Sequence, residues 1–194
     1  MSGVPRGERS VSPSRGRSGC RSSGYPEGMT TLSHAVRVVD AYDHDGEVNL
    51  RGFSASLATY TVALSALVAV ARAAGSAPDR YAVSDLLVGG LATHKFSRLL
   101  ARGSVTSPVR APFTEFVGAA GASEHDERPR GDHGVRHTVG ELLTCPFCLG
   151  VWIGTAYVAG LALAPRPTRA WAAAFAVTGV SDFLQHAYGR ARGD

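Results

Sequence analysis

A Cys-x-x-Cys sequence, residues 145–148 (CPFC), stands directly before a long apolar run and is the most reactive pattern in the chain. Two thiols at this spacing can act as a redox couple or supply half of a tetrahedral zinc site. A thioredoxin-type enzyme also needs alternating strands and helices, which the sequence does not indicate. A zinc site needs about four ligands, and the candidate partners His94 and His137 have no diagnostic spacing from the cysteines. A structural role at the start of a helix is therefore the favoured interpretation, and no cofactor is expected.

The residues around the cysteines indicate where this helix begins. Thr144 suits the N-cap position and Pro146 suits the first helical turn. If the helix extended back through Pro146, then Glu141, Cys145 and Cys148 would share one face, because their spacing is i, i+4, i+7. This gives an alternative hypothesis: a membrane thiol-redox protein with Glu141 as proton acceptor, or a zinc-binding protein. In the favoured interpretation no residue is catalytic.

The run after the cysteines belongs to a pattern of apolar segments. Residues 52–71 and 142–165 carry no charge, and at about 1.5 Å per residue each can cross a hydrocarbon core of about 30 Å. Two further runs are interrupted by charged residues. We therefore predict an all-α fold, a small multi-span helical membrane bundle within residues 51–192, and a soluble helical protein is the competing class. About four spans are expected, near residues 53–72, 81–100, 147–165 and 170–188.

The remaining segments are polar. Residues 1–28 are rich in Ser, Arg and Gly and predict a disordered tail, and residues 29–50 predict a short amphipathic or interfacial segment. Residues 118–136 are charged and Gly-rich and predict a flexible loop. Basic residues concentrate in the tail, in residues 102–140 and at the C-terminus. The positive-inside rule therefore places both termini and this large loop in the cytoplasm of a multi-pass cell-membrane protein.

Two sets of polar side chains lie in or beside the expected spans. Lipid phosphates attract basic side chains at a membrane surface by about 1 kcal/mol per residue, although such residues also simply flank spans. The candidates for lipid or phosphate binding are Lys95, Arg98, Arg102 and Arg110. Acids within spans are paired or functional, so Asp182 is expected to bond to His186 one turn away. Asp85 is expected to meet an Arg or His of another helix.

Two blocks of the sequence carry a family resemblance. GLATHKFSRLLARGSVTSPVRAPFTEF and ELLTCPFCLGVWIG together resemble an uncharacterised family of bacterial membrane proteins, the domain of unknown function thirteen-sixty, which has sporulation-associated members. The resemblance covers about residues 84–154. It implies a membrane location and supplies no reaction.

These observations predict an integral membrane protein that is not an enzyme. It would present a basic, Cys-containing cytoplasmic face to lipid, including anionic headgroups, or to a protein partner. Gly150 and Gly154 form a G-x-x-x-G pattern, which suits packing against a partner helix or a second copy. The net charge of +4 would also suit nucleic acid, but no recognition motif accompanies it, so nucleic-acid binding is not expected.

Overall fold

The computed structural model describes residues 41–42, 48–121 and 123–193. The chain divides into two units, residues 1–44 and 45–194, and the description below concerns the second. The predictions for the tail, residues 1–28, and for most of the segment 29–50 lie outside the described residues.

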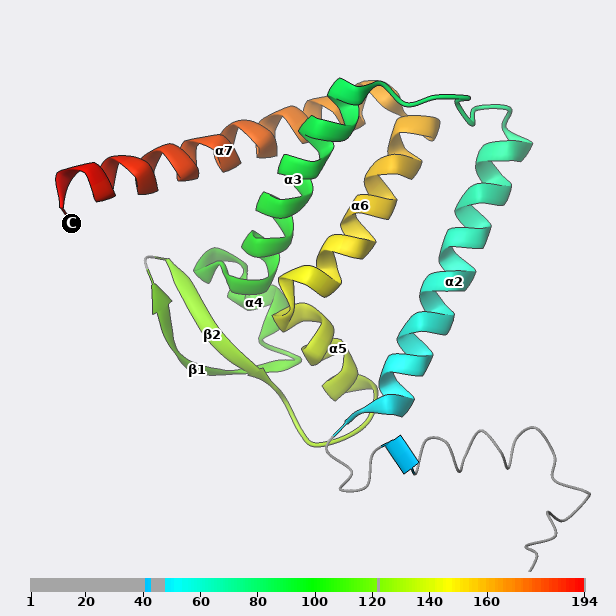
Figure 1. The fold of residues 1–194 in the computed structure, drawn as a ribbon. Coiled ribbons are helices and arrows are strands. Elements are labelled where there is room, and N and C mark those ends of the chain that lie inside the picture. Colours follow the sequence, from blue (N-terminus) through cyan, green and yellow to red (C-terminus); the bar gives the residue numbers. More distant parts are fainter. Residues whose placement is uncertain (1–40, 43–47, 122, 194) are drawn as a thin grey trace, which may run out of the picture. The chain divides into compact units, whose positions relative to one another are not determined.

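Long helices form in each of the four segments where spans were predicted (Figure 1). They are α2 (Leu50–Ala73), α3 (Val83–Arg102), α6 (Pro146–Leu163) and α7 (Pro165–Arg192). Local chemistry sets their ends. The Asn49 side chain accepts a hydrogen bond from the Gly52 N–H at the start of α2 (3.1 Å). Proline occupies the first turn of α6 and of α7, where its missing N–H costs nothing.

Fewer helices than the four predicted spans have the length and apolar composition of a membrane span. Among the described helices, α2 and α6 are the two that are long and apolar enough to cross a membrane. The helices at residues 81–100 and 170–188 do not meet that criterion by themselves. The reason lies in their polar residues, since α3 carries Asp85, Lys95 and Arg98, and α7 carries Asp182, Gln185 and His186.

The segment predicted to be a flexible loop, residues 118–136, is largely ordered secondary structure, so the all-α prediction was wrong here. Strands β1 (Thr114–Gly121) and β2 (Glu124–Pro129) form an antiparallel ribbon, in which Thr114 is opposite Pro129. Gly121 and Ser123 have positive φ, which suits the tight turn between the strands. The segment resembles a linker in composition, yet the acidic residues of β2, Glu124, Asp126 and Glu127, are held by arginines of neighbouring helices.

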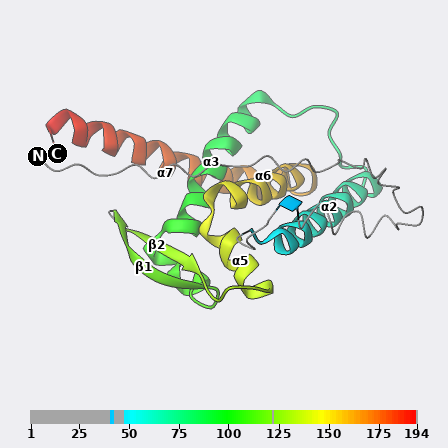
Figure 2. The same ribbon diagram turned by 60° about the horizontal axis from the view of Figure 1, so that its bottom comes forward.

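Short elements join the ribbon to the long helices. The 3-10 helix η1 (Ser104–Thr106) and α4 (Ser107–Arg110) precede it, and α5 (Val135–Thr144) follows it. Figure 2 shows the ribbon beside α5, and β2 contacts both α5 and α3. We call residues 103–144 the cap.

The apolar core lies where α3, α6 and α7 pack together. Its buried members are Ala92, Tyr157, Leu161 and Ala172. The Tyr157 hydroxyl donates to the backbone oxygen of Asp85 (2.7 Å), so the ring spans the gap between α6 and α3. Gly89 leaves room for this ring, because a Cβ at that position would lie 2.0 Å from a Tyr157 ring atom.

Replacing Gly89 by alanine should therefore destabilise the protein. A methyl group at this position displaces a buried ring, which costs about 1–3 kcal/mol. The matched control is Gly90→Ala, because nothing lies within 4 Å of a Cβ there. That change should be neutral or stabilising by up to about 1 kcal/mol, from helix propensity. Thermal unfolding followed by circular dichroism measures both, and equal effects of the two variants would contradict this packing.

Candidate functional site

Polar contacts gather where α2 and α6 begin, against the cap. Asn49, just before α2, donates from Nδ2 to the Thr138 hydroxyl (2.8 Å) and to Glu141 Oε2 (2.7 Å), both on α5. Its Oδ1 accepts the hydrogen bond from the Gly52 N–H at the start of α2. One amide thereby starts a helix and fixes it to the cap.

The cysteine pair lies at the junction of α5 and α6. The helix begins at Pro146, so the prediction that the pair marks a helix start is confirmed. The N-cap is Cys145 rather than Thr144, which is the last residue of α5. Cys145 has extended backbone angles (φ −106°, ψ 103°), and its Sγ accepts a hydrogen bond from the Cys148 N–H (3.2 Å). Both thiols are free, with Cys145 half-buried and Cys148 exposed.

Glu141 is not directed at the thiols by a continuous helix. The extended conformation of Cys145 separates α5 from α6, so the i, i+4, i+7 face is not formed. The Glu141 carboxylate accepts from Asn49, and His137 Nε2 lies 3.6 Å from it. This carboxylate contributes to joining α2 to the cap. Its role as a proton acceptor remains a prediction.

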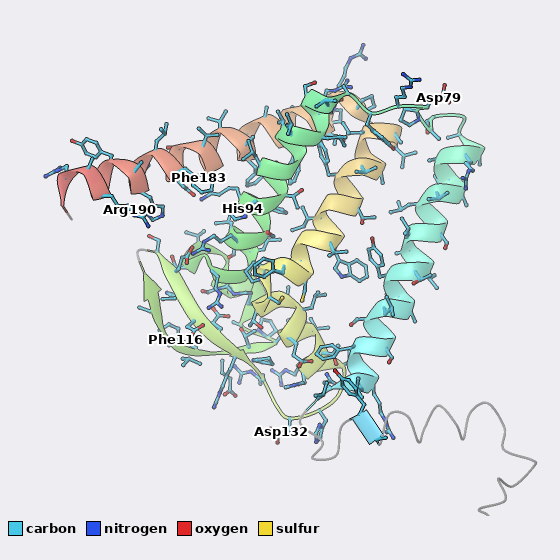
Figure 3. All side chains as sticks on the ribbon, in the orientation of Figure 1. Asp79, His94, Phe116, Asp132, Phe183 and Arg190 are labelled. Carbon is cyan, nitrogen blue, oxygen red and sulfur yellow. The ribbon has the colours of Figure 1, made fainter. Side chains whose placement is uncertain are left out.

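The two candidate additional metal ligands have other neighbours. His137 Nδ1 lies 2.6 Å from the backbone oxygen of Gly131. His94 stacks on Phe183 of α7, with ring centroids 6.0 Å apart, and Figure 3 shows these two side chains side by side. Within the described residues, no three His, Cys, Asp or Glu side chains gather in a way that could hold a metal ion.

The basic side chains at the end of α3 meet acids of strand β2. Arg98 forms a two-pronged pair with Glu124 (2.7 and 2.8 Å), and Arg102 pairs with Asp126. Residues four apart on a helix are about 6 Å apart along its axis, and residues two apart on a strand about 6.7 Å. The two spacings agree well enough for both pairs to form together.

Arg110 is buried and forms the centre of the cap. Its Nε and Nη2 donate to the two carboxylate oxygens of Glu127 (3.0 and 2.6 Å). Its Nη1 donates to the backbone oxygens of Leu100 (2.7 Å) and Gly103 (3.0 Å), at the end of α3. A helix leaves its last carbonyls without partners, and here the guanidinium satisfies that of Leu100 and also binds the oxygen of the C-cap residue Gly103. Arg110 is 0% exposed and so is not part of an exposed basic surface.

Glu127 stays ionised in this setting. Burial disfavours its charged form, but hydrogen bonds from Arg110, Thr114 and Ser107 outweigh burial and hold its pKa below the ordinary value of 4.5. The Thr114 hydroxyl lies 2.6 Å from Glu127 Oε2. Arg110 and Glu127 therefore face each other as full charges at neutral pH, which makes these hydrogen bonds strong.

The acids of the helices pair across α3 and α7. Asp85 accepts from Arg169 Nη2 (2.7 Å) and Nε (3.0 Å), which confirms the predicted partner from another helix. Asp182 pairs with Lys95 rather than with His186, so the local pair expected within α7 was wrong. Lys95 sits beside Gly179 of α7, where a Cβ would lie 3.4 Å from the Lys95 Cβ.

The predicted lipid-binding set is thus brought into ion pairs. Each of its members has a carboxylate partner, and three of these partners lie on β2. Binding of lipid by this set remains a prediction.

Comparison with known proteins gives one match. The family model described as "Protein of unknown function (DUF1360)" matches residues 88–188, just over half of the chain. The chain belongs to the DUF1360 family. It matches no curated protein and no solved structure. The DUF1360 region includes most of α3 and α7, the whole cap, the cysteine pair and α6, whereas α2 lies outside it.

Sequence reasoning missed two residues that organise this DUF1360 site, Asn49 and Glu127. Asn49 had a local signal, since asparagine followed by a long apolar run favours an N-cap. Glu127 had a weaker signal. Successive side chains of a strand point to opposite faces, so in residues 124–128 (EHDER) Glu127 lies on the face opposite to Glu124 and Asp126. Only the fold reveals that each face of this strand meets a different set of arginines.

Replacing Arg110 by methionine should strongly destabilise the DUF1360 cap. The change leaves the Glu127 carboxylate buried without its counter-charge and removes the donor to the Leu100 carbonyl of α3, which costs about 3–5 kcal/mol. The matched control is Arg128→Met, because the Arg128 side chain is 72% exposed and its pair with Glu115 is worth less than about 1 kcal/mol. Chemical unfolding of the purified protein measures both. Similar stability of the two variants would show that the buried pair does not hold the cap.

Proposed function

We propose that this protein is a non-enzymatic, multi-pass integral membrane protein that presents its cap and cysteine pair to a protein partner at the cytoplasmic face. The observation that carries the proposal is the exposure of the apolar helix α2. This helix of 24 residues is apolar enough to span a membrane, and none of its residues is buried by the rest of the described chain. A core helix of a soluble protein would be covered. A bilayer supplies the missing apolar surroundings.

The directions of the helices support more than one crossing. Both α2 and α6 begin at the cap, α2 through Asn49 and α6 directly after α5. If both cross in the same direction, the chain must return between them. α3 makes this return, since it ends at Arg102 beside the cap and packs against α6.

The charge pairs support placing α3 and α7 in or near the bilayer as well. An isolated charge is costly in a membrane, and pairing reduces that cost. Asp85 pairs with Arg169 and Lys95 pairs with Asp182. These contacts progress in the same order along both helices, so α7 has the same sense as α3, and Figure 1 shows the two helices crossing at a wide angle.

The cap suits a protein partner better than a lipid surface. Arg110, Arg128 and Arg130 of the cap pair with acids, as do Arg98 and Arg102 at the adjoining end of α3, which leaves little charge for headgroups. Arg136 donates to the backbone oxygen of Pro112 instead. Strand β1 pairs with β2 on one side, and Phe116 and Val117 on it are 65% and 59% exposed. An open strand edge with exposed apolar side chains is a common docking site for an extended segment of another protein. The arginines of the cap favour the cytoplasmic side.

Membrane fractionation and labelling from each side test the proposal. The protein should remain in the membrane after carbonate extraction. Asp79, in the turn after α2, and Asp132, in the cap, lie at opposite ends of the helices (Figure 3). In a cysteine-free background, Asp132→Cys should react with an impermeant thiol reagent only from the cytoplasmic side, and Asp79→Cys only from the other. Release by carbonate, or labelling of both from one side, would contradict the proposal.

A second candidate function is thiol-disulfide exchange at the cysteine pair. The observation that favours it is the placement of both free sulfurs at the start of α6, Cys145 at the N-cap and Cys148 in the first turn, with the exposed Cys148 available to a partner. In such an exchange the two thiols would form a disulfide, and a disulfide of the partner would accept two electrons and two protons.

Thiol titration separates this candidate from a structural role. In a Cys20→Ser background, an active pair should lose two thiols on mild oxidation and regain both with reductant. Cys145→Ser and Cys148→Ser should each leave one thiol that forms a mixed disulfide. Zinc measured in the same sample tests the metal alternative. If both thiols resist mild oxidation and no zinc is bound, the structural role is the one that remains.

A further inference from the structure

An apolar groove lies between α2 and α6. Its volume is about 370 Å³, and its walls include Leu64, Leu67 and Val68 of α2 and Val158 and Ala162 of α6. Near the cap the two helices touch, where the rings of Tyr60 and Trp152 meet edge to face (5.2 Å) and the Tyr60 hydroxyl bonds to Thr155 (2.8 Å). Beyond this contact the helices leave the groove between them.

A single cation stands among the groove-lining residues. Arg72, in the last turn of α2, lines the groove at the end away from the cap. It is exposed, and no described carboxylate forms an ion pair with it. An arginine at the end of a span reaches the headgroup level while its stem stays in apolar surroundings.

We propose that this groove binds one acyl chain of an anionic lipid, with the negative headgroup at Arg72. The proposal rests on the proposed function, because it needs α2 and α6 in a bilayer. The occupant is argued from volume and charge. An apolar cavity of about 150 Å³ accommodates benzene, so 370 Å³ has room for a chain of about 15 carbons. A negative head on an apolar tail complements Arg72 at the mouth of such a groove.

The groove differs from the predicted lipid-binding set in position and chemistry. That set lies at the cap end and is occupied by carboxylates. Arg72 lies at the other end of α2, and a ligand there is held mainly by its tail. A free fatty acid shares the same chemistry, so the test must distinguish it from a phospholipid.

Photo-crosslinking tests the groove directly. The full chain is reconstituted in phosphatidylcholine vesicles that contain a trace of phosphatidylglycerol with a photoreactive acyl chain. Parallel samples contain the same chain on phosphatidylcholine or as a free fatty acid. Crosslinks should map to α2 and α6 along the groove. Ala71→Trp fills the groove and should reduce them roughly tenfold. Val70→Trp, at an exposed neighbour that does not line the groove, is the matched control and should leave them unchanged.

The headgroup is tested separately. Arg72→Gln should weaken crosslinking of the phosphatidylglycerol probe about fivefold, the equivalent of about 1 kcal/mol per basic residue. It should leave the phosphatidylcholine probe unchanged. Arg51→Gln, at the other end of α2, should affect neither. A preference for the fatty acid over phosphatidylglycerol identifies a free acid as the occupant, with the same chemistry.

Failure of this inference is distinguishable from failure of the proposed function. Equal crosslinking of Ala71→Trp and Val70→Trp, in a protein that resists carbonate extraction, would overturn the groove as a lipid site and leave the membrane proposal intact. Lipid crosslinks that map to other surfaces of the protein, with none along the groove, would also overturn it. Release by carbonate would overturn both.

Discussion

The buried pair of Arg110 and Glu127 is the interaction on which the described structure depends. Two charges removed from water are costly, and they are tolerated here because nearly every donor and acceptor of the pair has a partner. The guanidinium closes the end of α3 while the carboxylate holds β2. The ribbon therefore cannot leave α3 without separating Glu127 from Arg110, which would leave two charges without their partners. The cap is joined in turn to α2, by the hydrogen bonds between α5 and Asn49, and to α6, by the chain itself at Cys145.

The apolar part of this architecture could be predicted, because a charge-free run has few alternatives. Helices formed where 53–72 and 147–165 were expected to span, and also at the interrupted segments. The ribbon could not be predicted in the same way. Its strands have little apolar alternation, and their stability comes from arginines more than 10 positions away in sequence. The same limit explains Asp182: His186 is close in sequence, but Lys95 is close in space.

The cysteine pair shows which features could be predicted from the neighbouring sequence and which could not. Its position at a helix start followed from Pro146, and the structure bears this out. The choice of Cys145 over Thr144 as N-cap depends on the bend between α5 and α6, which no local pattern specifies. The Glu141 carboxylate accepts a hydrogen bond from Asn49, so it helps to join α2 to the cap.

The pairing of α3 with β2 has a geometric limit. Each step of four residues turns a helix about 40° past a full turn, and each step of two residues on a strand advances about 0.7 Å further than the helix does. Two successive charge pairs tolerate this drift, but a third would be rotated about 80° out of line. The chain follows this limit: α3 ends at Arg102, and the next residue on that face of β2, Arg128, turns to Glu115 of β1 instead. A longer ribbon would gain no further support from a straight helix, so the cap is about as large as this kind of pairing can hold.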